Sequence, residues 1–246
     1  MSLVRMSVPT RYPPAVTWAL IAVNCAIFLF QINLSPSELE WFLVNFALIP
    51  ARYFLPGALG LPDPALIDYL PFATNMFLHG GWLHLIVNMW TLWLFGPAIE
   101  DRFGPGPYFM FYLACGVIAS VTHAMLNPAS VDPALGASGA IAGVMGAFLR
   151  LFPFARVIVL VPILFLPLFF EMHAVVYVGF WFFMQILQGT VELLLPSTGG
   201  GVAWWAHIGG FVAGLVFGSL LQPLRRGYRP YYADEGIYGF TPYGYR

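Results

Sequence analysis

Long apolar stretches alternate with short polar, glycine-rich or proline-rich segments along most of the chain. An apolar stretch of about 20 residues can cross the hydrocarbon core of a bilayer as a helix. Six stretches approach or reach this length: residues 15–32, 81–99, 108–126, 138–152, 174–195 and 202–221. The pattern therefore predicts an all-α, polytopic membrane protein in which six transmembrane helices form a bundle.

Two segments between these stretches fit neither a crossing nor a simple turn. Residues 33–78 are too long for a turn, and they combine several prolines with aromatic and aliphatic side chains. We expect them to lie in or near the membrane interface. Residues 157–170 are apolar but short, with Pro162 and Pro167 inside. A stretch of that length favours an interfacial or re-entrant segment over a crossing.

The chain divides into three parts by composition. Residues 1–14 form a short N-terminal tail, residues 15–221 the six-helix domain, and residues 222–246 a C-terminal tail rich in Tyr, Gly and Arg. The first apolar stretch is longer than the core of a signal peptide and no A-x-A cleavage site follows it, so we expect a retained crossing. We expect the C-terminal tail to be disordered.

Composition supports a lipid environment. Hydrophobic residues make up 60% of the chain and charged residues only 9%, compared with about 25% charged residues in a soluble domain. A charge at the bilayer centre costs about 2.5–3.5 kcal/mol on insertion scales, which explains such a shortage. The net charge is −1 and there is no basic tract, so we expect no nucleic-acid partner.

The arginines predict the orientation in the membrane. With six crossings, Arg52 alone lies on one side, and the other arginines lie on the opposite side with both chain ends. Cytoplasmic loops carry an excess of arginine, so both termini should be cytoplasmic. A seventh crossing at residues 157–170 would move the last four arginines outside, which disfavours it. Short tails and the lack of a targeting presequence favour the cell (inner) membrane of a prokaryote.

A few polar side chains lie inside the predicted crossings. Placing a polar group there costs free energy, so such residues are candidates for a functional role. His84 and Asn88 lie in the second crossing, Ser138 in the fourth and His207 in the sixth. These three crossings all run from outside to inside. Since His84, Ser138 and His207 each fall near the start of their crossing, we expect them at a similar depth, close to the outer face and in one site.

The neighbours of Ser138 suit a site that binds a peptide carbonyl. Ser138 lies at a loop-to-helix junction, and the start of a helix leaves backbone N–H groups without intrahelical partners. The small residues Gly136 and Gly139 would let an extended backbone approach. His84 and Asn88, four residues apart, share one face of their helix. Glycines at four-residue spacing permit close helix contact, and they are Gly139, Gly143, Gly210, Gly214 and Gly218.

Each of these residues has a plainer interpretation on its own. A lone Ser in a membrane helix is usually a packing residue bonded to its own backbone, and Asn88 could join two helices. A lone His near a helix end is usually an interfacial residue, which we expect of His123 and His173. These plainer interpretations are less convincing together, because His84, Ser138 and His207 lie at a similar depth on alternate crossings.

Three segments resemble the signatures of the rhomboid intramembrane serine proteases. They are residues 79–88 with the sequence HGGWLHLIVN, residues 136–139 with GASG, and residues 206–210 with AHIGG. Their order and spacing match the family, and so do Gly96, Glu100 and Gly104 after the second crossing. The resemblance covers residues 74–218 and implies a six-helix rhomboid-like bundle with a water-filled cavity that opens outwards.

The resemblance also implies roles. Ser138 would be the nucleophile and His207 the general base, and His84, Asn88 and the Ser138 N–H would form the oxyanion hole. His79 matches a further histidine near the site. Two departures stand out. Residues 70–73 read LPFA where many members carry Trp-Arg, and Ala142 stands where some members stack an aromatic ring on the catalytic histidine, which leaves open what orients His207.

The expected activity is hydrolysis of peptide bonds in or near transmembrane segments of other membrane proteins. No carboxylate lies in the outer half of a crossing, and Asp132 in the adjoining loop is only a weak candidate for the third residue of a catalytic triad. We therefore predict a Ser-His dyad. The absence of lysine excludes a Ser–Lys pair. We expect no cofactor and no metal, because His79, His84 and His207 lack an accompanying carboxylate or thiolate.

Two other classes of function compete with this one. A transporter would show internal repeats and polar groups near the midplane, and neither is present in the sequence. A client-binding relative without activity usually lacks the nucleophile or the base, whereas Ser138 and His207 are both present. The expected partners are therefore the bilayer and membrane-protein substrates, and the sequence leaves the oligomeric state open.

Overall fold

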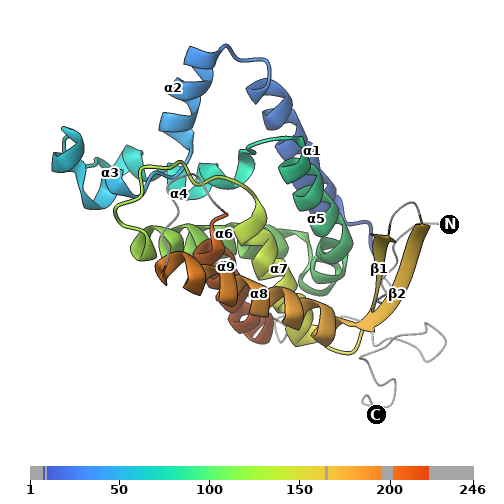
Figure 1. Cartoon of the computed structure of the whole chain (residues 1–246). Coiled ribbons are helices and arrows are strands. Elements are labelled where there is room, and N and C mark those ends of the chain that lie inside the picture. The colour runs from blue at the N-terminus through green and yellow to red at the C-terminus, as the bar shows by residue number, and fades with distance from the viewer. Residues whose placement is uncertain (1–7, 9, 164–165, 195–201, 222–246) are drawn as a thin grey trace.

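The computed structural model describes residues 8, 10–163, 166–194 and 202–221, and within these residues the protein is mostly helical (Figure 1). Six apolar helices correspond to the six predicted crossings, which confirms the predicted fold class. They are α1 (Ala15–Gln31), α5 (Trp82–Phe103), α6 (Pro105–Leu126), α7 (Ser138–Leu151), α8 (Ala174–Leu194) and α9 (Trp204–Leu221). Of these, α5, α6, α8 and α9 are long and apolar enough to cross a membrane, and α1 and α7 are shorter.

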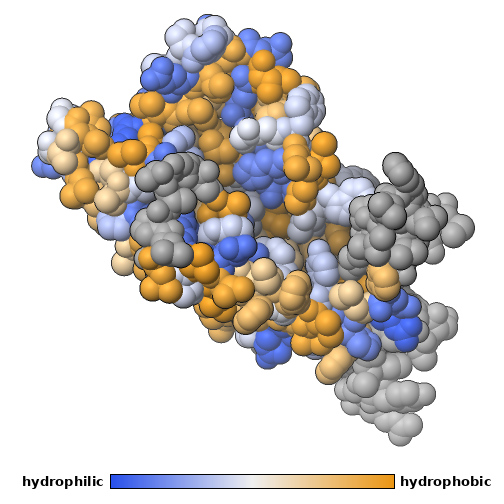
Figure 2. Space-filling model, in the orientation of Figure 1, coloured by the Kyte–Doolittle hydropathy of each residue, from blue (hydrophilic) through white to orange (hydrophobic). Residues whose placement is uncertain are grey.

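The surface of the bundle is apolar in a way that suits lipid. Leu83 is 75% exposed, Phe180 65% and Met110 64%, and all three lie on the long apolar helices. Apolar side chains cover much of the visible face of the protein (Figure 2). Contiguous exposed apolar surface of this extent is unfavourable in water and favourable in a bilayer. The protein is therefore a multi-pass membrane protein.

Helix α7 lies at the centre of the bundle, between α5, α6 and α9. Nearly all of its residues are buried, including Phe148 and Met145. The contact with α9 is backbone against backbone. A Cβ on Gly210 would collide with the carbonyl oxygen of Gly139, and a Cβ on Gly214 with that of Gly143. Glycine is required at these positions because only its lack of a side chain allows the two helices to approach so closely.

The long predicted connection after α1 contains short helices in place of an irregular loop. Ser35 and Glu38 form a capping box at the start of its first helix, where the Ser35 N–H donates to Glu38 Oε2. The segment lies at one end of the bundle (Figure 1). Its elements are α2 (Pro36–Phe46), α3 (Ala51–Phe54), η1 (Pro56–Leu59), η2 (Leu66–Tyr69), α4 (Pro71–Thr74) and η3 (Asn75–Phe77).

Between α7 and α8 the chain forms a β-hairpin, the one departure from an all-helical fold among the described residues. Strands β1 (Arg156–Ile163) and β2 (Leu166–His173) pair antiparallel. The hairpin projects from the bundle on the side away from α2 and α3 (Figure 1). Pairing of the two strands satisfies their backbone groups without a helix, so the described residues of this segment form no re-entrant helix.

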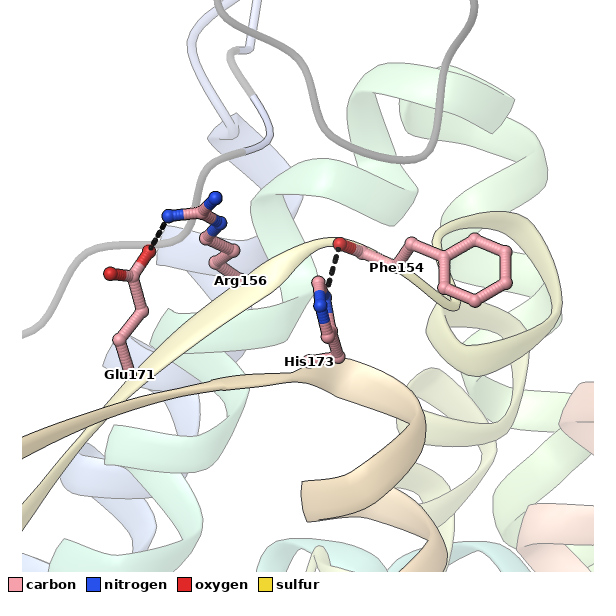
Figure 3. A network of polar contacts seen from close by, with 4 residues as sticks. All are labelled: Phe154, Arg156, Glu171 and His173. Carbon is pink, nitrogen blue, oxygen red and sulfur yellow. Dashed lines mark hydrogen bonds and ion pairs between the residues drawn. The ribbon is translucent and has the colours of Figure 1, made fainter.

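The base of the hairpin is held by two polar contacts (Figure 3). Arg156 Nη1 and Glu171 Oε1 form an ion pair at 2.9 Å. His173 Nδ1 lies 3.0 Å from the carbonyl oxygen of Phe154, and the ring nitrogen must donate because a carbonyl oxygen only accepts. His173 therefore has a structural partner at the base of the hairpin, in agreement with the expectation that it lies outside the site.

The end of α5 fixes the start of α1. The Glu100 carboxylate accepts hydrogen bonds from the Val16 N–H and the Thr17 N–H, both at 2.8 Å, and from the Thr17 hydroxyl at 2.7 Å. Asp101 Oδ1 accepts from the Arg11 and Tyr12 N–H groups. The Glu100 carboxylate thereby satisfies N–H groups that the start of α1 leaves unpaired. The predicted C-terminal tail, residues 222–246, lies outside the described residues.

Candidate active site

Three of the predicted site residues lie at the starts of three neighbouring helices. Ser138 is the first residue of α7, and His84 and His207 lie in the first turns of α5 and α9. The Ser138 Oγ is 2.7 Å from His207 Nε2. His207 is buried with 8% of its surface exposed, and Ser138 is partly exposed. The structure thus joins a hydroxyl and an imidazole from residues 69 positions apart in the chain.

The close approach of α7 and α9 is what makes this hydrogen bond possible. Gly210 lies one turn after His207 and rests on the backbone of Gly139, the residue after Ser138. Since no side chain separates the two helices there, the short Ser138 side chain reaches the imidazole without a water between them. The predicted packing glycines thus lie directly next to the Ser138–His207 pair.

The other ring nitrogen of His207 faces a residue that the sequence did not single out. His207 Nδ1 is 2.7 Å from Oε1 of Gln185, which lies on α8 and is itself buried. Two indole rings flank the imidazole: Trp181 at 5.9 Å between centroids and Trp204 at 6.2 Å. Asp132, the weak candidate for the third residue of a catalytic triad, is exposed in the loop before Ser138. A glutamine inside an apolar crossing was the one available signal for Gln185.

His84 and Asn88 face the backbone two residues before Ser138. His84 Nδ1 accepts a hydrogen bond from the Gly80 N–H at 3.4 Å, so in the neutral ring Nε2 carries the proton. A Cβ built on Gly136 would lie 2.8 Å from His84 Nε2 and 3.7 Å from Asn88 Nδ2. Asn88 Nδ2 is buried and has no hydrogen-bond partner among the described residues.

Unpaired buried donors of this kind are rare in folded proteins and call for an explanation. The two donors converge on the space next to Gly136, which has a φ of 126° that favours glycine. The Ser138 N–H belongs to the first turn of α7, where intrahelical partners are missing. His84 Nε2 and Asn88 Nδ2 therefore border the same space next to Gly136, two residues before Ser138.

The long segment after α1 holds the loop that leads to Ser138. Leu48 and Ala134 exchange two backbone hydrogen bonds, at 3.0 and 2.8 Å, and the Gly136 N–H donates to the Asn75 carbonyl at 2.9 Å. Irregular backbone at membrane depth is tolerated only where protein satisfies its polar groups. This pairing is the structural role of the long first loop.

A small cavity of about 20 Å³, partly open to the surface, lies beside Ser138. Its lining includes Leu135, Gly139, Ala203 and His123, so His123 borders the site although the sequence suggested an interfacial residue. His123 shares a hydrogen bond with Asn127. The cavity has room for about one water molecule next to the hydroxyl.

His79 contacts His84, and no contact between His79 and Ser138 is found among the described residues. Its backbone is tied to the Gln31 side chain of α1, and its ring packs edge-on against His84 with centroids 5.2 Å apart. It can therefore position His84. Over the described ranges, no three His, Cys, Asp or Glu side chains come together as a metal site would require.

Comparison with protein families supports the assignment of the fold. A family model for the rhomboid domain matches residues 68–224, which is more than half of the chain and contains α5–α9 with every site residue named above. The chain belongs to the rhomboid family.

Several curated rhomboid proteins are similar in sequence. Rhomboid protein 1, mitochondrial, of Saccharomyces cerevisiae is 26% identical over 217 residues, which cover 84% of this chain and 53% of the relative. The rhomboid protease GluP of Bacillus subtilis is 31% identical over 140 residues, 55% of this chain and 24% of the relative. The chain thus spans about half of the yeast protein and about a quarter of the Bacillus protein.

The two departures from the rhomboid pattern have structural counterparts. Where many members carry Trp-Arg, this chain has the start of α4, beginning at Pro71. Ala142, which cannot stack on His207, is fully buried within α7. The aromatic contacts to the imidazole come from Trp181 and Trp204 on the two helices that follow the hairpin.

Proposed function

We propose that this rhomboid protein is an intramembrane serine endopeptidase with Ser138 as nucleophile and His207 as general base. The observation that carries the proposal is the 2.7 Å contact between Ser138 Oγ and His207 Nε2 inside an apolar helical bundle. A serine hydroxyl bonded to a histidine nitrogen is the arrangement that activates a weak nucleophile. The protease names of relatives such as that from Bacillus subtilis agree with it.

The reaction follows from this geometry. His207 Nε2 takes the Ser138 proton as Oγ attacks the scissile carbonyl carbon, and the carbonyl oxygen becomes an oxyanion next to His84 Nε2, Asn88 Nδ2 and the Ser138 N–H. The C–N bond breaks as the imidazolium gives its proton to the leaving amine, which leaves an ester on Ser138. Water then attacks this ester, with His207 again as base, and releases the carboxylic acid and the Ser138 hydroxyl.

The substrate class follows from the depth of the pair. Ser138 and His207 lie at helix starts, so water and an unwound segment can reach them from one face without crossing the hydrocarbon. We propose transmembrane segments of other membrane proteins as substrates, since their chains pass the site at this depth.

We propose the cell (inner) membrane as the location, with both termini cytoplasmic. Arg102 and Arg150 lie in the last turns of α5 and α7, and Arg156 follows α7, at the ends away from Ser138. Asp63→Cys, in the loop on the opposite face, should react with a membrane-impermeant maleimide in intact cells. Arg150→Cys, at an exposed position in the last turn of α7, should react only after lysis, and the reverse pattern would contradict the orientation.

The test of the proposed function uses the full chain in lipid vesicles with single-span substrates, with products mapped by mass spectrometry. We expect Ser138→Ala and His207→Ala to abolish cleavage, because loss of the base alone costs about 10²–10⁴ in rate. Asn88→Ala should retain measurable activity, lower by about 2.7–4 kcal/mol in transition-state stabilisation. Full cleavage by Ser138→Ala would rule out the mechanism.

A further inference from the structure

We propose that Gln185 of α8 is a positioning residue for His207, which holds the imidazole in the tautomer that can accept the Ser138 proton. The inference rests on the proposed function and extends it from a dyad to three hydrogen-bonded residues on α7, α9 and α8. Gln185 Oε1 lies 2.7 Å from His207 Nδ1, on the side of the ring opposite to Ser138.

The orientation of the Gln185 amide fixes the hydrogen-bond directions. Its Nε2 group donates to the Trp181 carbonyl oxygen at 3.1 Å, and a carbonyl oxygen can only accept. The end of the amide that faces His207 must therefore be the oxygen, which also only accepts. It follows that His207 Nδ1 carries the proton and that Nε2 presents its lone pair to the Ser138 hydroxyl.

The same contact also acts during the reaction. When Nε2 takes the Ser138 proton the imidazole becomes a cation, and the Gln185 oxygen then accepts a hydrogen bond from a charged donor. Such bonds are stronger than neutral ones. This is the part that a carboxylate plays in a Ser-His-Asp triad, where it holds the tautomer and stabilises the imidazolium.

The burial of Gln185 on α8 also supports its role as a positioning residue for His207. Gln185 is 5% exposed, whereas Gln188 on the same helix is exposed. A buried glutamine in an apolar helix is unfavourable unless its polar groups are paired, and here both ends of the amide are paired, one of them with His207. The Trp181 ring, one turn earlier, packs beside the imidazole and limits its rotation.

The first experiment compares isosteric variants of the full chain in vesicles. Gln185→Met keeps the length of the side chain and removes the acceptor. We expect its kcat to fall about 10–100-fold at unchanged KM, the range for loss of a hydrogen bond to a charged group. Labelling of Ser138 by a serine-directed phosphonate should slow by a similar factor. Gln188→Met, the same change at an exposed site of the same helix, should match the wild type.

The second variant tests tautomer control independently of stability. Gln185→Glu keeps an acceptor opposite Nδ1 and adds a negative charge that stabilises the imidazolium. We expect substantial activity, with the acid limb of kcat/KM moved to higher pH, because the imidazole then loses its proton only at higher pH. His84 and His123, the other titratable side chains near His207, stay unchanged in every variant.

The outcomes separate the two proposals. Wild-type kcat in Gln185→Met, or a Gln185→Glu variant that is inactive or has an unshifted acid limb, would overturn the role of Gln185 and leave Ser138 and His207 in place. Cleavage that persists in Ser138→Ala would instead remove the proposed function itself. If Gln185→Met does not fold, as judged by its thermal unfolding, the acid limb of Gln185→Glu decides alone.

Discussion

Helices α7 and α8 both contribute to the candidate site, but they are attached to the bundle in opposite ways. Helix α7 is buried on nearly every side and meets α9 through glycine backbones. In α8 only 22% of the crossing stretch is buried, compared with 39% in α9. Its contacts with α9 are made by side chains, above all by the rings of Phe182 and Phe211, which stack at 4.1 Å.

This difference assigns separate tasks to the two helices. The proposed nucleophile comes from the helix that cannot move without breaking the bundle, so the distance from Ser138 to His207 is fixed by backbone packing. The partner of the other imidazole nitrogen comes from a helix held by a few side chains. Elements with few buried contacts open most easily, so we expect α8 to open more readily than α7 and α9.

The largest effect is expected where the backbones of α7 and α9 touch. Gly214→Ala would place a Cβ against the carbonyl oxygen of Gly143 and force the helices apart. Overpacking of this kind costs about 1–3 kcal/mol of stability. A shift of the imidazole by about 1 Å can lower the rate 10²-fold. We expect a lower unfolding temperature in detergent together with nearly complete loss of cleavage.

The matched control is the same substitution in α8. A Cβ on Gly179 would meet no side chain or neighbouring helix of the described residues within 4 Å, so Gly179→Ala points into open space. Alanine in a helix interior is favoured over glycine by about 0.5–1 kcal/mol, and stability should be unchanged or slightly raised. Equal damage from both substitutions would show that the two helices are packed alike, contrary to the comparison.

A smaller effect is expected from loosening α8. Phe182→Ala removes the stacked pair with Phe211, and such aromatic pairs contribute about 0.5–1.5 kcal/mol beyond their buried area. The docked position of α8, and with it the Gln185 contact, should become up to about tenfold less favourable. We expect a matching fall in cleavage and faster amide hydrogen exchange in α8, while α7 stays protected.

Phe183→Ala serves as the control for this variant, because Phe183 is the next residue in α8 and is 57% exposed. Its removal should leave both cleavage and hydrogen exchange unchanged. If Phe182→Ala instead accelerated exchange in α7 as strongly as in α8, the two helices would form one cooperative unit and the proposed division of tasks would be wrong.

The helices and the residues around Ser138 could be predicted from the sequence because each depends on a pattern within a single segment of the chain. Apolar length predicted the crossings, and the helices α1 and α8 end within one residue of the predicted limits at both ends. The shared depth of His84, Ser138 and His207 followed from the alternating direction of the crossings. Glycine spacing indicated which helix faces could meet, although it could not show which of them do.

Gln185 and the hairpin were not predicted, for a different reason. Gln185 and Gln188 lie three residues apart in one apolar stretch, and only the rotation of α8 in the bundle decides which of them faces His207. Residues 157–170 are a short apolar run, for which periodicity does not separate a strand from a helix. Their structure depends on pairing with each other, with Pro162 opposite Pro167, which no single segment reveals.

The carboxylate of Glu100 has a consequence for how the protein meets membranes of different thickness. The carboxylate accepts hydrogen bonds from two N–H groups and a hydroxyl at the start of α1. If α1 slid along its axis, these three donors would lose their acceptor in an apolar environment. A helix that cannot slide adjusts to a thinner bilayer by tilting. In a short-chain lipid, α1 and α5 should therefore incline together as one rigid pair.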